Sequence, residues 1–187
     1  LVFKVSSTVN IPYNEGAQIQ FDTGVRYAKG AGVSKDLVEA AKWYRNSADQ
    51  GLLAAQKELA RCYWWGSGVP HDVNEAVKWY RKAADQGDPE SQYRLADCYK
   101  SGRGVPKDED ESAKLYRKAA DLGNADAQRS LGSAYLFGSG VQKDSSEAAK
   151  WQVKAVGTYR KAANQGDVEA QNSLGSCYKY GIGTPKD

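Results

Sequence analysis

A seven-residue signature recurs along this chain of 187 residues and constrains its fold more than any other feature. The signature reads Gly-x-Gly, then Val or Thr, two variable residues and Asp, and it occupies residues 30–36, 66–72, 102–108, 138–144 and 181–187. Its first three steps are 36 residues long and the fourth is 43. A period of this length is typical of proteins whose units bury their apolar faces only by stacking on one another. The sequence therefore predicts a solenoid of repeats.

The first half of each repeat has the pattern of a helix, which we call helix A. In one repeat, Ala55, Leu59 and Tyr63 recur at the spacing of a single helical face, and close copies of this stripe follow in the later repeats. A small residue, Ala60 in this case, follows the Leu and leaves room for a neighbouring helix. The stripe ends at the first Gly of the signature, which suits the left-handed position at a helix C-terminus.

The second half of each repeat predicts another helix, which we call helix B. The Asp that ends the signature precedes a Glu by three residues, as Asp72 precedes Glu75. This spacing predicts a capping box, in which each side chain accepts a hydrogen bond from the other residue's backbone N–H. The Lys and Arg residues of helix B, such as Arg81, stack into a basic ridge that could attract an anionic partner, but a solvated outer face is the favoured interpretation. Each repeat is thus predicted to be an antiparallel helical hairpin.

The fold class that follows is all-α, a superhelix of helical hairpins. Seven residues are inserted at 152–158 and account for the longer fourth step. They correspond to almost two helical turns, so we expect that helix B to be about two turns longer with Tyr159 on its usual face. The predicted helices span residues 17–29, 37–49, 53–65, 73–86, 89–101, 109–122, 125–137, 145–164 and 168–180.

The domain organisation predicted from this pattern is a non-repeat segment followed by one repeat array. The segment covers residues 1–14, with a hint of extended structure near residues 2–5, and the array covers residues 15–187. Its units are expected at residues 15–50, 51–86, 87–122, 123–165 and 166–187. Because the chain lacks Met and ends at a helix-capping Asp, we expect it to be a piece of a longer protein. The uncovered last helix A is expected to favour self-association through the C-terminal end.

Composition and motifs argue against several function classes. The formal charge of +3, with acidic and basic residues interspersed, is too weak for a nucleic-acid-binding surface, and no apolar run is long enough for membrane insertion. His71 is the only histidine, so neither a metal site nor a catalytic triad is expected. The Gly-x-Gly loops follow helices and lack a Gly-Lys-Ser/Thr sequence, which argues against phosphate binding. We therefore expect no cofactor and no catalytic residue.

The three cysteines occupy equivalent positions in their repeats. Cys62, Cys98 and Cys177 each lie four residues before the signature, where the fourth repeat has Ala134. Equivalent positions in different layers are poorly placed for a disulfide, so we expect buried thiols. Free thiols favour a reducing compartment, and the sequence gives no other indication of localisation.

The fourth repeat resembles the Sel1-like repeat family, a branch of the tetratricopeptide-like solenoids. The resemblance rests on Ala127-Gln128, Leu131-Gly132, Tyr135, Gly138, Gly140-Val141 and Asp144. It recurs in the other repeats and covers most of the chain. The resemblance implies a right-handed α–α superhelix that acts as an adaptor in protein complexes, and it implies no catalytic residues. An ordinary tetratricopeptide array remains the close alternative, although its period is about 34 residues.

The positions that differ between repeats indicate a binding surface on helix A, opposite the apolar stripe. Large aromatic residues and Arg are the side chains that dominate binding interfaces. The candidate partner-binding residues are Lys57, Arg61, Trp64, Trp65, Tyr93, Asp97, Lys100, Arg129, Leu136 and Phe137. Our first hypothesis is a scaffold that holds a protein or peptide segment in a groove lined by these residues.

Other interpretations of this surface and of the chain remain open. Trp65 and Phe137 could instead pack against the adjacent loops. The chain could be an accessory or regulatory domain of a longer enzyme or signalling protein. A hydrolase in its own right is disfavoured by the single histidine and by the lack of a paired nucleophile and base.

Overall fold

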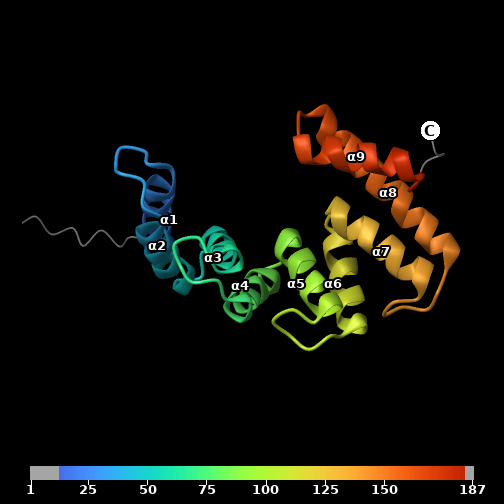
Figure 1. The fold of residues 1–187 in the computed structure, drawn as a ribbon, viewed down its shortest axis with the longest axis horizontal. Coiled ribbons are helices and arrows are strands. Elements are labelled where there is room, and N and C mark those ends of the chain that lie inside the picture. The colour runs from blue at the N-terminus through green and yellow to red at the C-terminus, as the bar shows by residue number, and fades with distance from the viewer. Residues whose placement is uncertain (1–12, 184–187) are drawn as a thin grey trace, which may run out of the picture. The chain divides into compact units, whose positions relative to one another are not determined.

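The computed structural model describes residues 13–183, which form nine α-helices and no strand. Odd-numbered helices are the A helices of successive repeats and even-numbered helices are the B helices (Figure 1). The helices are α1 (Tyr13–Lys29), α2 (Leu37–Asp49), α3 (Leu53–Trp65), α4 (Val73–Asp85), α5 (Pro89–Ser101), α6 (Glu109–Asp121), α7 (Ala125–Phe137), α8 (Ser145–Asn164) and α9 (Val168–Tyr180).

The predicted helices are confirmed, and their ends agree to within one residue except at the start of α1. That helix begins at Tyr13, four residues before the predicted start. Its additional turn contains Glu15, whose charge is favourable at the positive end of a helix dipole. The extended structure expected near residues 2–5 lies outside the described residues.

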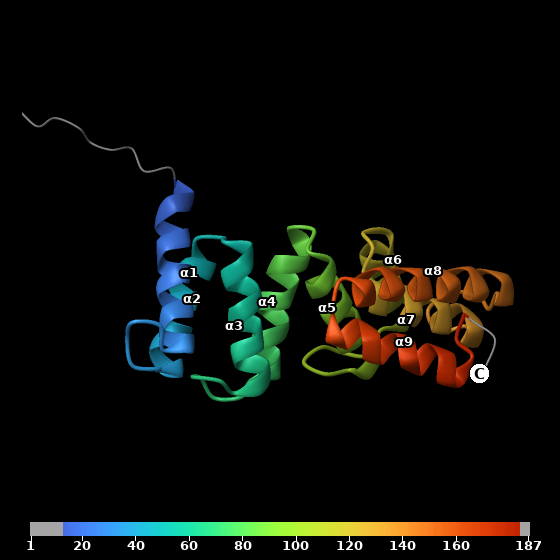
Figure 2. The same cartoon turned by 90° about the horizontal axis from the view of Figure 1, so that it is seen from above.

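The chain divides into two compact units, one ending at Asp72 and the other beginning at Val73. In the first unit, α1 packs against α2 and α2 packs against α3. In the second unit, each helix from α4 to α9 packs against the next helix in the chain. Figure 2 shows α7, α8 and α9 of this unit lying side by side.

The predicted apolar stripe of helix A forms the core. Leu59 and Leu131 are completely buried and Leu95 is almost so. The small residue after this Leu allows close packing, because a Cβ added to Gly132 would lie 3.1 Å from the Ala148 carbonyl oxygen. On α9 the equivalent Gly175 has no neighbour within 4 Å of an added Cβ. The expected self-association through this end of the chain remains a prediction.

The Gln of the stripe makes a polar contact that recurs between helices. The Nε2 atom of Gln128 donates a hydrogen bond of 3.1 Å to the carbonyl of Ala120, near the end of the preceding helix B. The Gln residues of the other repeats make the same bond at 3.2–3.3 Å. The Ala120 carbonyl also accepts the Gly123 N–H at 3.1 Å, so the Gln side chain supplies a second donor at the end of helix B.

The predicted capping box forms only in part. Asp144 accepts hydrogen bonds from the backbone N–H groups of Ser146 and Glu147, and Asp36 and Asp108 cap their helices in the same way. The prediction that the Glu147 carboxylate accepts the Asp144 N–H is wrong, because this carboxylate pairs with Lys150 at 2.7 Å instead. The Asp144 N–H donates to the Tyr135 carbonyl at 2.9 Å. The end of α7 thus supplies the partner that the capping box would have supplied.

The second Gly of the signature packs against the helix B of the repeat before it. Gly140 has φ +67°, a conformation that strains any residue with a side chain. A Cβ added there would also lie 1.9 Å from the Glu109 carbonyl oxygen, at the start of α6. Gly68 stands in the same relation to Leu37 in the first unit. The loops that contain Gly68, Gly104 and Gly140 therefore seat against the start of the previous helix B, whereas the second Gly of the last signature meets Gln152, within the insertion of α8.

The seven-residue insertion lengthens α8 as predicted. This helix is unbroken over 20 residues, whereas the other B helices have 13, and Tyr159 is buried. The Tyr159 hydroxyl donates to Asp126 at 2.6 Å. In the preceding hairpin, Tyr116 donates to Asp97, whose equivalent in α7 is Ser133. Because Asp126 lies seven residues before Ser133, the insertion moves this contact about two turns along helix A.

The prediction of buried thiols is confirmed, since all three cysteines are free and buried. Burial raises the pKa of the Cys98 thiol to about 11 from its ordinary value near 9. In the unfolded chain the thiol ionises at its ordinary pKa, so this group contributes stability below pH 9. That contribution is lost progressively between pH 9 and 11.

We expect Cys98→Ala to reduce the alkaline loss of stability, because the variant lacks the buried thiol. Ala134 occupies the equivalent position, so the variant should fold with a loss of about 1 kcal/mol at pH 7. Urea unfolding of both proteins at pH 7.5 and 10.5 measures the effect. An equal fall in the unfolding free energy of both proteins between these pH values would refute it.

Candidate functional site

The candidate surface carries highly exposed aromatic rings. Trp65 is 72% exposed and Phe137 is 75% exposed, and both are the last residues of their A helices. The adjacent loops therefore do not cover these rings. Tyr180 ends α9 in the same way and is 65% exposed, although the sequence did not single it out as a binding residue. Its position in the repeat was the signal that could have identified it.

A pocket lies beside each of these three rings. The pocket next to Phe137 has a volume of about 300 Å³ and is formed by α5, α6, α7 and the loop after α7. Equivalent residues form a pocket of about 160 Å³ next to Trp65 in the first unit. Another of about 260 Å³ lies next to Tyr180 in the second unit, between α7 and α9. The repeated hairpins thus create a repeated pocket.

Small side chains line the floor of the pocket beside Phe137. Ala113, Ala134 and the ring of Tyr116 provide its apolar part, and Ser130 and Ser133 add hydroxyl groups. The charged lining residues are Lys100 and Glu109. This combination offers an apolar cavity with polar groups around it, as binding pockets commonly do.

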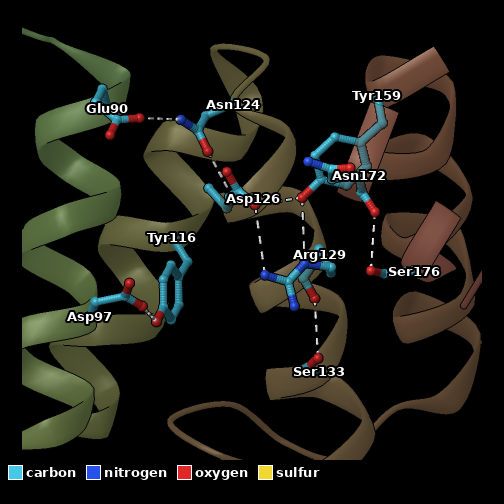
Figure 3. Close-up of polar contacts among 11 residues, drawn as sticks. Glu90, Asp97, Tyr116, Asn124, Asp126, Arg129, Ser133, Tyr159, Asn172 and Ser176 are labelled. Carbon is cyan, nitrogen blue, oxygen red and sulfur yellow. Dashed lines mark hydrogen bonds and ion pairs between the residues drawn. The ribbon is translucent and has the colours of Figure 1, made fainter. Parts of the chain in front are cut away.

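A cluster of hydrogen bonds joins side chains of the A helices α5 and α7 to Tyr residues of the B helices α6 and α8, and Figure 3 shows most of it. Tyr116 donates to Asp97, and its ring lies 6.0 Å from that of Tyr93. On α7, the Nε atom of Arg129 lies 3.4 Å from the Tyr159 hydroxyl, and a second nitrogen of the same side chain lies 3.6 Å from Asp126.

The surroundings of this cluster raise the pKa values of its phenols. Burial is the main cause that raises the pKa values of Tyr93, Tyr116 and Tyr159, and bonds to the neighbouring carboxylates raise them further. The phenols donate hydrogen bonds to carboxylates at physiological pH, as Tyr side chains ordinarily can, and the raised pKa values extend this state to more alkaline pH. They hold Asp97 and Asp126 in place. Sequence reasoning found Tyr93, Asp97 and Arg129 but missed the other members, because their partners lie on different helices.

The remaining candidates are distributed along α3, α5 and α7. Arg61 is exposed and pairs with Glu58 at 3.4 Å, and Lys57 is half-buried. Trp64 is also half-buried, whereas Lys100 is exposed. Leu136 is 37% exposed. The structure brings Lys100 and Phe137 to one pocket, Arg61 and Trp65 to another, and Tyr93 close to Asp97 and Arg129. Leu136, Lys57 and Trp64 lie on the same A helices but line none of these pockets.

The Arg residues of helix B are not simply part of a solvated face. Arg81 donates to the Tyr99 hydroxyl at 2.7 Å, and Arg160 donates to Tyr178 at 2.8 Å. The equivalent Arg residues of α2 and α6 make the same bond to the next helix A. Arg81 and Arg160 are exposed, as expected of a solvated face, and their equivalents in α2 and α6 are half-buried. In all four hairpins the Tyr hydroxyl at the edge of the stripe provides an acceptor for the Arg.

Two further features bear on the class of site. Among residues 13–183, no group of His, Cys, Asp and Glu side chains is arranged to hold a metal ion. In the same part of the chain, no helix combines the length and apolar character needed to cross a membrane.

Stacked helical hairpins with variable, aromatic-rich A helices define a helical repeat protein. The Sel1 repeat model matches residues 17–52, 53–88, 89–124, 125–167 and 168–187. The chain belongs to the Sel1 repeat family. Proteins of this family are generally non-catalytic scaffolds for protein–protein interaction.

Solved structures agree with this assignment. A protective antigen present in uropathogenic Escherichia coli strains, with an SLR fold, is 34% identical with a TM-score of 0.72. The match covers 96% of this chain but 46% of the antigen, so the chain spans about half the length of that relative. A Sel1 repeat protein from Oxalobacter formigenes is 37% identical, with a TM-score of 0.72 and coverage of 91% and 67% of the two chains. A search of curated proteins gave no match.

Proposed function

We propose that this chain is a non-catalytic scaffold that binds a protein or peptide segment through the exposed faces of its A helices. The observation that carries the proposal is the exposure of Trp65 and Phe137 beside pockets at equivalent positions of the repeat. Large rings left in water cost free energy, and rings of this kind commonly become the anchors of an interface.

The polar cluster next to these rings supports the same proposal. Asp97 and Asp126 are held by phenol donors, and Arg129 is half-buried with its side chain fixed by two neighbours. Side chains fixed before binding lose little conformational freedom when a partner arrives. The cluster therefore offers a pre-organised set of donors and acceptors beside an apolar pocket.

The experiment is a selection of binding segments from a random 16-residue peptide library displayed on phage. We expect selected peptides to lose about 2 kcal/mol of binding, or roughly 30-fold in affinity, in Trp65→Ala or Phe137→Ala. The melting temperature should hardly change, because both rings are exposed. Isothermal titration calorimetry and circular dichroism measure the two effects.

The matched control is Leu122→Ala, which removes an exposed apolar side chain outside the candidate surface. It should leave affinity and melting temperature unchanged. Equal affinity of the selected peptides for the wild type, Trp65→Ala and Phe137→Ala would show that they bind elsewhere, and the proposal would then be rejected.

A further inference from the structure

The three equivalent pockets share a chemical character that the repeat pattern does not require. Each has an exposed aromatic ring on one wall and one Lys or Arg in its lining. The basic residue is Arg61 in the pocket beside Trp65. It is Lys100 in the pocket beside Phe137 and Arg129 in the pocket beside Tyr180.

These bases come from different positions of the repeat. Arg61 corresponds to Ser133 in the pocket of α5 and α7, and Lys100 corresponds to Ala28 in the pocket of the first unit. The packing of the hairpins therefore does not need a base at either position. A positive charge beside an aromatic ring recurs although a different residue supplies it. This recurrence indicates that the pockets accept the same kind of occupant.

In the second unit the two positive charges differ in their pairing, because Arg129 has an acidic partner and Lys100 has none within residues 13–183. Lys100 forms no ion pair with any residue in the described part of the chain, and Glu109, the acid in its pocket, is paired with Lys107 at 2.6 Å. Arg129 lies 3.6 Å from Asp126, which also accepts the Tyr159 hydroxyl, and no acidic residue lines the pocket between α7 and α9.

The two pockets of the second unit share α7. Its Ser130, Ser133 and Phe137 line the pocket toward α5, and its Arg129 lines the pocket toward α9. One extended segment crossing α7 could therefore reach both pockets. Their volumes of about 300 and 260 Å³ fit single apolar side chains with room for a polar neighbour.

Resting on the scaffold function proposed above, we propose that the partner of the second unit is an acidic, apolar segment. It places an aromatic or large aliphatic side chain in the pocket beside Phe137 and pairs an adjacent Asp or Glu with Lys100. A second apolar side chain enters the pocket beside Tyr180, next to a carboxylate that pairs with Arg129. The opposite charge of segment and pocket selects this partner over a basic segment.

The test uses three fluorescein-labelled 12-residue peptides and measures their affinity by fluorescence anisotropy. One peptide carries Phe and Glu among Gly and Ser residues, the second has Lys in place of each Glu, and the third has Ala in place of each Phe. We expect the Phe/Glu peptide to bind at least tenfold more tightly than either of the others. Its affinity should also fall between 0.05 and 0.5 M salt, because salt screens exposed charges.

Two variants locate the binding, each with a matched control. Lys100→Glu should weaken the Phe/Glu peptide about tenfold and strengthen the Phe/Lys peptide, whereas Lys161→Glu, which changes the same charge on the exposed end of α8, should have an effect below twofold. Phe137→Ala should weaken the Phe/Glu peptide, and Leu122→Ala should not.

The proposal is overturned if the Phe/Glu and Phe/Lys peptides bind equally, if neither binds, or if Lys161→Glu has the same effect as Lys100→Glu. The scaffold function fails separately, since it depends on whether library-selected peptides require Trp65 or Phe137. If those peptides require the rings but carry no acidic residues, the function stands and the acidic partner is rejected.

Discussion

Gly140→Ala should destabilise the second unit by about 4 kcal/mol. A left-handed backbone conformation costs a non-Gly residue about 1 kcal/mol or more, and a methyl group forced into a packed contact adds about 1–3 kcal/mol or more. Both costs apply, because the added Cβ would lie 1.9 Å from the Glu109 carbonyl oxygen at φ +67°. Urea unfolding followed by circular dichroism measures the loss.

Gly123→Ala is the matched control for this substitution. Gly123 also has a positive φ, +89°, but an added Cβ would have no neighbour within 4 Å. Its loss should be the conformational part alone, about 1 kcal/mol. Equal losses in the two variants would mean that the signature loop does not press against the start of α6.

Leu131→Ala should cost about 3 kcal/mol of unfolding free energy, because the side chain is completely buried between α7 and its neighbours. The half-buried Leu174 occupies the equivalent position on α9, so Leu174→Ala should cost about half as much. Thermal and urea unfolding of the two variants gives the comparison.

The exposed Leu122 provides a control of the same residue type. Leu122→Ala should change stability by less than about 0.5 kcal/mol. If Leu131→Ala and Leu122→Ala gave similar values, the Leu of the helix A stripe would not be a core residue, and the assignment of the apolar stripe would fail.

The helices and their pairing could be predicted because each rests on a local pattern that repeats. The Gly that ends helix A, the Asp that caps helix B and the spacing of the buried Leu each act within a few residues. The insertion in α8 was predictable for the same reason, since seven residues nearly restore the helical register.

Contacts between repeats could not be predicted in the same way. The Gly140 contact with α6 and the Arg81 bond to Tyr99 join residues whose separation in space depends on how the hairpins stack. The capping box failed for a related reason, because the Asp144 N–H finds a carbonyl at the end of α7. The local motif identifies the Asp N–H as a donor, but it does not show that a carbonyl of the preceding helix competes with the Glu side chain for this N–H.

The candidate site shows the same division. Exposed rings such as Phe137 follow from their position opposite the stripe, and the sequence identified them. The bonds from Tyr116 to Asp97 and from Tyr159 to Asp126 form between helix B and helix A, and Tyr159 reaches Asp126 only because of the insertion. The sequence therefore identified the exposed side chains of the surface and missed the helix B residues that hold it in place.

Site-specific photo-crosslinking of a library-selected peptide tests the proposed binding surface most directly. The photoreactive residue p-benzoylphenylalanine replaces Trp65, Phe137 or Val153 in turn, and Val153 serves as an exposed position on α8 outside the candidate surface. The account predicts that the peptide crosslinks from position 65 or 137 and gives no product from position 153. Crosslinking from position 153 alone would contradict it.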